Sequence, residues 1–172
     1  MAMLNNIYQY DLRLLLWCRK SRFYPQFISF IRILSRTGDG YLQLLVPLCY
    51  AAISPQDGYH FLELAAIAFA IERLLYFSLK NVLKRPRPPE VVPDFTSIIC
   101  ASDQFSFPSG HTMAAFLLAG LCFLTFGMLA LPLYIWAIAI AISRVVLGVH
   151  FPSDTLAGAL LGTSIAFLVV LL

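Results

Sequence analysis

Long apolar stretches alternate with short polar breaks along most of the chain. The breaks are "RTGDG", "SPQDG", a proline-rich stretch after Arg85, "FGMLALP" and the segment around Gly148. Glycine and proline at these places favour turns and end helices. The pattern predicts six apolar helices: 23–36, 40–54, 60–84, one from about 109 to the turn at 126–132, then 132–147 and 152–172.

The segment before residue 23 has two faces rather than one apolar run. On a helical projection its polar and apolar positions separate, and Trp17 lies near the basic end. Such a pattern is typical of a helix that lies in the membrane interface, here over residues 1–22. The polar face holds Asn6, Gln9, Arg13 and Lys20, and the apolar face holds Leu4, Tyr8, Leu12 and Leu15.

Composition places these helices in a membrane. The chain is 60% hydrophobic and 12% charged, with a mean hydropathy of +0.80, whereas soluble domains carry roughly 25% charged residues. A crossing needs about 20 apolar residues. A chain of 172 residues therefore has room for several crossings within one domain. We predict a single all-α, polytopic membrane helix bundle over residues 1–172, with about six transmembrane helices and the N-terminal interfacial helix.

The charge pattern narrows the choice of partners. The net charge is only +3 and the positive residues are clustered, which favours a local anionic ligand and the lipid bilayer over nucleic acid. Six crossings would place both termini on one side. The positive-inside rule makes that side the cytoplasm, on the strength of Arg13, Arg19, Lys20 and Arg22.

Three polar patches meet on one membrane face when the six helices alternate in direction. They are "KNVLKRPRP" at 80–88, "PSGH" at 108–111 and "SRVVLGVHFPSD" at 143–154. The loop 85–107 between the first two is long for a compact bundle, and such loops are usually functional or disordered. We therefore expect 85–107 to lie on the side of an active site.

The first patch is basic. Lys80 and Lys84 are one helical turn apart, and the prolines around Arg87 hold it in an extended geometry. Lys80 and Arg87 could clamp a phosphate, although a helix end that binds lipid headgroups would look the same by itself.

The second patch begins a helix. Ser109 is a good N-cap, and Gly110 lets a ligand approach the backbone at the positive end of the helix, where anions bind. His111 lies in the first turn, where a bound phosphate would restore its protonated form and make it a usable acid. A plain helix cap followed by an interfacial histidine remains the alternative.

The third patch combines a cation with a histidine and a carboxylate. Arg144 ends one helix, and Asp154 follows His150 by four residues, in the first turn of the next. Asp154 could accept the Nδ1 proton of His150 and leave Nε2 as a nucleophile. A structural hydrogen bond is the alternative.

A metal site is not expected. The chain has three histidines, of which His60 is predicted to lie on the opposite side, and no HExxH spacing. We predict neither metal nor cofactor. The cations, the helix N-terminus and the two imidazoles fit a phosphoryl group best.

Together, the three patches resemble the signature of the type 2 phosphatidic acid phosphatase superfamily. Lys80 precedes Arg87-Pro88 by six intervening residues, "PSGH" follows, and Ser143-Arg144 precedes His150 and Asp154 at the matching spacing. The resemblance implies a metal-independent membrane phosphatase with six helices and an active site at the outer face. His150 would form a phosphohistidine, Asp154 would orient it, and His111 would protonate the leaving oxygen. The phosphate oxygens would be held by Lys80, Arg87, Ser109, Gly110 and Arg144.

The predicted function is hydrolysis of an amphiphilic lipid phosphate, such as undecaprenyl diphosphate, phosphatidylglycerol phosphate or phosphatidic acid. The predicted place is a bacterial inner membrane, with cytoplasmic termini and the active site facing the periplasm. Alternatives are a lipid phosphotransferase of the same superfamily and an anion transporter or channel. The sequence gives no oligomeric state.

Two further features of the helices carry structural predictions. Glu72 or Glu63, both on the third helix, is expected to pair with a basic residue and so fix helix packing, and Arg73 is expected to support the site from below. Gly158 and Gly162 form a GxxxG motif that predicts close helix packing.

Overall fold

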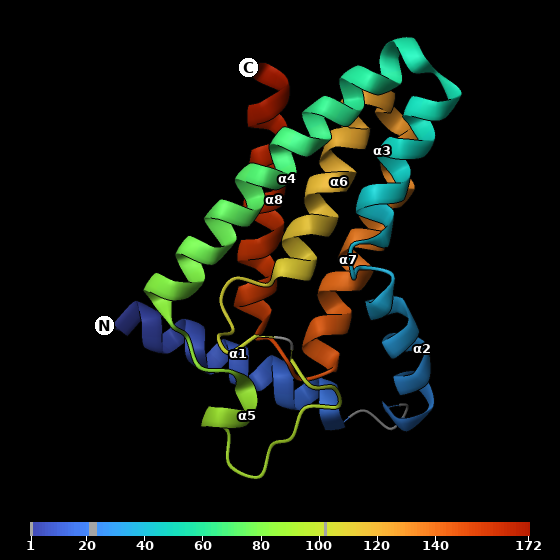
Figure 1. The fold of residues 1–172 in the computed structure, drawn as a ribbon. Helices are drawn as coiled ribbons and strands as arrows, with labels where there is room; N and C mark the ends of the chain where they lie inside the picture. The colour runs from blue at the N-terminus through green and yellow to red at the C-terminus, as the bar shows by residue number, and fades with distance from the viewer. Residues whose placement is uncertain (1, 21–23, 102) are drawn as a thin grey trace.

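The computed structural model describes residues 2–20, 24–101 and 103–172, and every regular element within them is helical. This confirms the all-α prediction. Figure 1 shows a bundle whose helices run side by side, with the N-terminal helix lying across one end. The elements are α1 (Ala2–Lys20), α2 (Tyr24–Arg36), α3 (Tyr41–Ile53), α4 (Pro55–Leu83), α5 (Pro88–Val91), α6 (Gly110–Phe126), the 3-10 helix η1 (Gly127–Ala130), α7 (Leu131–Val146) and α8 (Pro152–Leu171).

The tightest packing in the bundle lies between α6 and α8. A Cβ added to Gly162 would lie 2.1 Å from the Met113 carbonyl oxygen, and one added to Gly158 would lie 2.7 Å from the Ser109 carbonyl oxygen. No side chain fits at such distances. The GxxxG motif therefore lets the two backbones touch, as predicted, and this contact brings the starts of α6 and α8 together.

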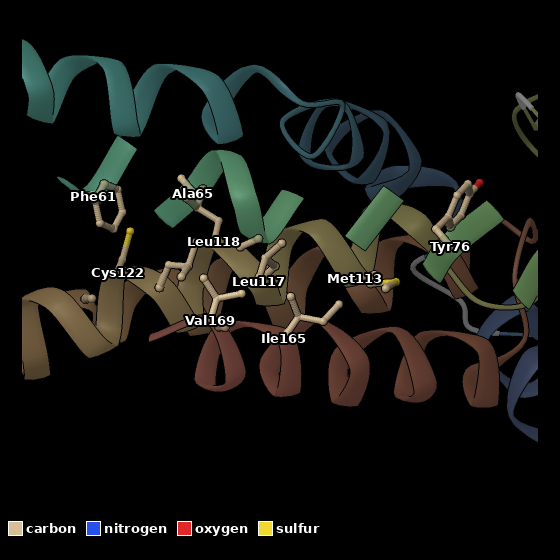
Figure 2. Packing of buried hydrophobic residues seen from close by; sticks show 13 residues of the cluster. Phe61, Ala65, Tyr76, Met113, Leu117, Leu118, Cys122, Ile165 and Val169 are labelled. Carbon is tan, nitrogen blue, oxygen red and sulfur yellow. The ribbon is translucent and has the colours of Figure 1, made fainter. Parts of the chain in front are cut away.

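A buried apolar cluster joins α4 to that pair (Figure 2). Phe61 and Ala65 of α4 pack toward Leu118 and Cys122 of α6, and Val169 of α8 completes the contact. Between helices surrounded by lipid, such contacts stabilise through van der Waals packing. The cluster fixes α4 against α6 along its length, so the end of α4 is held beside the start of α6.

The six predicted crossings are not confirmed. Two segments of the described chain are long and apolar enough to cross a membrane: Gly110–Val146, which contains α6, η1 and α7, and Pro152–Leu171. The helices α2 and α3 have 13 residues each, so each is about 20 Å long against a hydrocarbon core of about 30 Å. In Figure 1 they follow one another in the same direction and do not fold back on each other.

The first and last helices of the described chain end at different ends of the bundle. The helix α1 lies across the end of the bundle where α4 ends and α8 begins, and Asp11 of α1 contacts Arg85 and Ser153 there. The end of α8 lies at the opposite end of the bundle. Cytoplasmic placement of both termini, predicted from six crossings, is not confirmed by this arrangement and stays a prediction.

The amphipathic pattern of α1 agrees with its position. Leu15 is buried and Tyr8 and Leu12 are partly buried against the bundle, whereas Gln9 and Arg13 are exposed. The side chains of Leu4, Arg19 and Lys20, and residue Arg22 as a whole, lie outside the described part of the structure.

Two local boundaries differ from the prediction. Pro55 begins α4, so the expected turn at 54–58 is the first turn of that helix. The loop 85–107 contains the short helix α5, which Pro88 starts and in which the Glu90 carboxylate accepts a hydrogen bond from the Arg87 backbone N–H at 3.1 Å. Glu72 is fully buried and pairs with its neighbour Arg73, as predicted for an acid within this helix.

Candidate active site

A cavity of about 900 Å³ opens between α2, α3, α4 and α6. Its lining includes five of the eight predicted site residues: Arg87, Gly110, His111, Arg144 and His150. The two imidazoles therefore border the same space. The lining from α3 and α4 also contributes apolar side chains, namely Leu44, Pro47, Leu48, Leu62 and Phe69.

His150 is held by a carbonyl group rather than by the predicted carboxylate. It lies just before α8 and is only 2% exposed. Its Nδ1 lies 2.7 Å from the Ser106 carbonyl oxygen and 3.7 Å from Asp154 Oδ2. Only the first distance allows a hydrogen bond. Because a carbonyl oxygen can only accept, Nδ1 carries the proton and Nε2 keeps a lone pair, which is the tautomer expected from the sequence.

Burial also keeps His150 neutral. Removal from water is the largest effect and lowers the pKa of the imidazole; the interaction with Asp154 raises it, and the charges of Arg87 and Arg144 lower it further. The resulting pKa is about 4. At neutral pH the Nε2 lone pair is thus available for attack.

Asp154 supports His150 through Ser106. Its fully buried carboxylate accepts hydrogen bonds from the Ser106 hydroxyl and from the Phe151 backbone N–H, the latter at 2.8 Å. Arg85 Nη1 donates to the other oxygen at 2.6 Å. The same Ser106 thus contacts His150 with its carbonyl group and Asp154 with its hydroxyl group.

The N-terminal helix belongs to this network. Asp11 of α1 is buried, and its carboxylate accepts from Arg85 Nη2 at 2.7 Å and from the Ser153 backbone N–H at 2.9 Å. Arg85 also lies over the Phe151 ring, 4.4 Å from its centroid. Arg85 therefore links α1 to the carboxylate beside His150.

The predicted phosphate clamp is occupied by a carboxylate of the same chain. Asp103, in the loop before α6, forms ion pairs with Lys80 and with Arg87. It also accepts a hydrogen bond from the Tyr76 hydroxyl. Burial alone would raise the pKa of Asp103, but the hydrogen bonds from Lys80 and Tyr76 and the charges of Lys80 and Arg87 hold it at about 2. The two cations thus converge on an anion, as a phosphate would require.

Arg144 approaches the same cavity from α7. It is buried, and its Nη1 donates to the Ser35 hydroxyl at 2.8 Å. Its Nε is buried without a hydrogen-bond partner among the described residues. A buried N–H in this state costs free energy, so Arg144 retains capacity to bind an anion.

The "PSGH" segment has the predicted place but not the predicted cap. Ser109 precedes α6, yet its hydroxyl pairs with the Thr112 hydroxyl at 3.0 Å instead of capping the helix. A Cβ on Gly110 would lie 2.7 Å from the Tyr76 ring. Gly110 is therefore needed for this ring to approach the start of α6.

His111 contacts a carboxylate that sequence reasoning did not assign. Its Nε2 lies 2.8 Å from Asp39 Oδ1 in the turn between α2 and α3. The resulting pair borders the cavity.

Sequence analysis did not assign a supporting role in the site to five residues that have one in the structure. The break "RTGDG" marked a turn but not a partner for His111. For the other residues, nothing in the sequence indicates which distant side chain each one contacts, because loop conformation and helix order determine which side chains meet. These residues are Asp11, Asp39, Arg85, Asp103 and Ser106.

Several known proteins are similar to this chain in sequence and in architecture. Phosphatidylglycerophosphatase B of Bacillus subtilis (strain 168) is 39% identical over 117 residues, or 62% of this chain and 55% of that protein. The chain thus spans little more than half of that relative. Decaprenylphosphoryl-5-phosphoribose phosphatase of Mycobacterium tuberculosis (strain ATCC 25618 / H37Rv) is 31% identical over 150 residues, 84% of this chain and 80% of that protein.

A solved structure gives the same result for the fold. The crystal structure of Aquifex aeolicus LpxE superposes with a TM-score of 0.79 and 27% identity, covering 94% of each chain. A family model described as the PAP2 superfamily matches residues 61–172, which include all three sequence patches. The chain belongs to the PAP2 superfamily.

Proposed function

We propose that this protein is a lipid phosphate phosphatase that works through a phosphohistidine at His150 and needs no metal. One observation carries the proposal: the neutral imidazole of His150, with Nε2 unprotonated, borders the same cavity as His111, Arg87 and Arg144. A nucleophile, an acid and cations around one space are the groups that phosphoryl transfer requires.

In the first step Nε2 of His150 attacks phosphorus, and the bond between phosphorus and the lipid oxygen breaks. His111, as an imidazolium, gives its proton to that oxygen, so the lipid leaves as an alcohol or a lipid monophosphate. Arg87, Arg144 and Lys80 stabilise the charge on the phosphoryl oxygens, a contribution that is usually large. Substrate phosphate would replace the Asp103 carboxylate on Lys80 and Arg87.

In the second step water attacks the phosphohistidine. Neutral His111 accepts a proton from that water, the bond between nitrogen and phosphorus breaks, and inorganic phosphate leaves. Asp154, through Ser106, and the Ser106 carbonyl group keep the Nδ1 proton in place in both steps.

The apolar part of the cavity supports an amphiphilic substrate. A phosphate at the imidazoles would place an attached chain beside Leu44, Leu48 and Phe69. The two relatives act, by their names, on a glycerolipid phosphate and on a polyprenyl-linked phosphate. We propose a substrate of this class, with phosphatidylglycerol phosphate, phosphatidic acid and undecaprenyl diphosphate as the compounds to test.

We place the protein in a bacterial inner membrane with the site facing outward, as the family resemblance implies. Since α1 lies at the same end as the site, α1 is then outside as well. The exposed Cys100 lines the cavity and reports on this placement. A membrane-impermeant maleimide should label intact cells carrying the parent but label the Cys100→Ala variant less; equal labelling of the two would contradict the orientation.

The experiment for the activity is phosphate release from the three lipids in excess EDTA. We expect activity in the chelator and a loss of at least about 1000-fold in His150→Ala, because removal of a nucleophile costs several kcal/mol of barrier. His60→Ala, which changes the histidine in the second turn of α4, is the matched control and should keep parental activity. A requirement for added divalent metal would contradict the mechanism, and label passed to an added acceptor lipid would indicate a phosphotransferase.

A further inference from the structure

The turn between α2 and α3 is fixed against α7. The Thr37 hydroxyl donates to the Leu34 carbonyl oxygen at 2.7 Å and accepts from Trp136 Nε1 at 2.8 Å. A Cβ on Gly38 would lie 3.2 Å from the Ile140 side chain, so this backbone packs closely on α7. The residue that follows, Asp39, therefore has a defined position.

Asp39 uses that position to reach His111. Its Oδ1 lies 2.8 Å from His111 Nε2, across 72 positions in the sequence. The Asp39 side chain is 44% exposed and the His111 side chain 25% exposed. The pair joins the α2–α3 turn to the first turn of α6, and both residues border the cavity.

The surroundings of His111 explain why a carboxylate is needed there. The start of α6 carries a partial positive charge, and the guanidinium of Arg144 lines the same cavity as His111. Both disfavour an imidazolium. Asp39 is the carboxylate in direct contact with the imidazole. Asp39 thus offsets the positive field at the residue that must donate a proton.

We propose that Asp39 is a positioning residue for the general acid His111, an inference that rests on the proposed phosphatase function. It accepts a hydrogen bond from Nε2–H and stabilises the imidazolium. Since an imidazolium carries one proton on each nitrogen, the Nδ1 proton then serves the leaving oxygen. When the phosphorus–oxygen bond breaks, that proton moves to the lipid oxygen and His111 stays bound to Asp39 through Nε2–H.

This role predicts dependence on the leaving group. A lipid alkoxide is a poor leaving group and needs the proton, whereas p-nitrophenolate leaves as a stabilised anion. A general acid contributes about 100- to 10,000-fold. Weakening of the acid therefore slows hydrolysis of a lipid phosphate but spares p-nitrophenyl phosphate, whereas damage to the fold would slow both.

The test compares the parent, Asp39→Asn, Asp39→Glu and Asp57→Asn on phosphatidic acid and on p-nitrophenyl phosphate. We expect Asp39→Asn to lose about 10- to 100-fold in kcat on the lipid, a part of the contribution of a general acid, with much less loss on the aryl ester. Asp39→Glu should restore part of the lipid activity. Asp57→Asn, an exposed change in the first turn of α4, is the control and should match the parent.

Two results would overturn the role of Asp39: equal loss on the two substrates, or no loss on either. A parent that hydrolyses none of the lipid phosphates would instead overturn the proposed function itself, so the two failures are distinguishable.

Discussion

The carboxylate of Asp103 competes with substrate for the cations of the site, and its removal should tighten phosphate binding. Asp103 pairs with both Lys80 and Arg87, the two residues proposed to hold phosphoryl oxygens. A ligand that binds only after a competing group has left has a lower apparent affinity. The affinity is multiplied by the fraction of molecules in which the competing group is absent. The variant Asp103→Asn keeps the shape of the side chain and removes its charge.

The size of the effect follows from the contacts. A hydrogen bond to a charged group contributes about 1.5–3 kcal/mol net when buried. The Asp103 side chain is 29% exposed, so solvent weakens its two ion pairs, and we take about 1.5–2 kcal/mol for both together. That free energy corresponds to about a 10- to 30-fold lower inhibition constant for inorganic phosphate.

The assay is competitive inhibition of lipid hydrolysis by inorganic phosphate at several substrate concentrations. The inhibition constant and KM should both fall in Asp103→Asn, with kcat less affected. The matched control is Asp94→Asn, an exposed residue of the same loop with φ 56°, a conformation that asparagine tolerates. An unchanged inhibition constant, or a large loss of kcat at constant KM, would refute the competition.

Three further perturbations test other parts of the structure. Asp11→Asn should lower kcat more than it raises KM, because it removes a charge partner of Arg85; unchanged kinetics would show that α1 does not support the site. Gly162→Ala should lower the Tm in detergent, since overpacking costs about 1–3 kcal/mol and the added Cβ would meet the Met113 carbonyl oxygen. With a pKa of about 4, His150 is neutral at pH 6.5 and becomes protonated around pH 4. A pH–rate profile should therefore show no loss of activity near pH 6.5 from protonation of His150.

The helices were largely predictable because each depends on local pattern. Continuous apolar runs between glycine and proline breaks located α3, α6, α7 and α8 to within a few residues, and Gly158 and Gly162 predicted the close contact of α6 with α8. The relative direction of α2 and α3 was not predictable in the same way. Whether α3 folds back on α2 or keeps its direction depends on the turn at residues 37–40. The conformation of that turn depends on its tertiary contacts with Trp136 and Ile140.

In the candidate site, too, relationships within one segment were predictable and contacts between distant segments were not. Residues within one motif, such as His150 and Asp154, were found because their spacing along the chain limits their distance. Partners from distant segments were not, since nothing in the sequence relates Asp39 to His111 or Asp103 to Lys80. Even His150 donates its Nδ1–H hydrogen bond to the Ser106 carbonyl oxygen and not to Asp154, because this loop carbonyl group lies closer to Nδ1 than the side chain one helical turn away.

The central claim is that His150 carries the phosphoryl group during turnover, and a trapped intermediate tests it most directly. The protein is mixed with phosphatidic acid labelled with radioactive phosphate, quenched in base and digested, and the labelled peptide is sequenced. We predict an acid-labile, base-stable label on His150 that is absent from His150→Ala and present in His60→Ala. Label on another residue, or hydrolysis of the lipid by His150→Ala at the parental rate, would contradict the account.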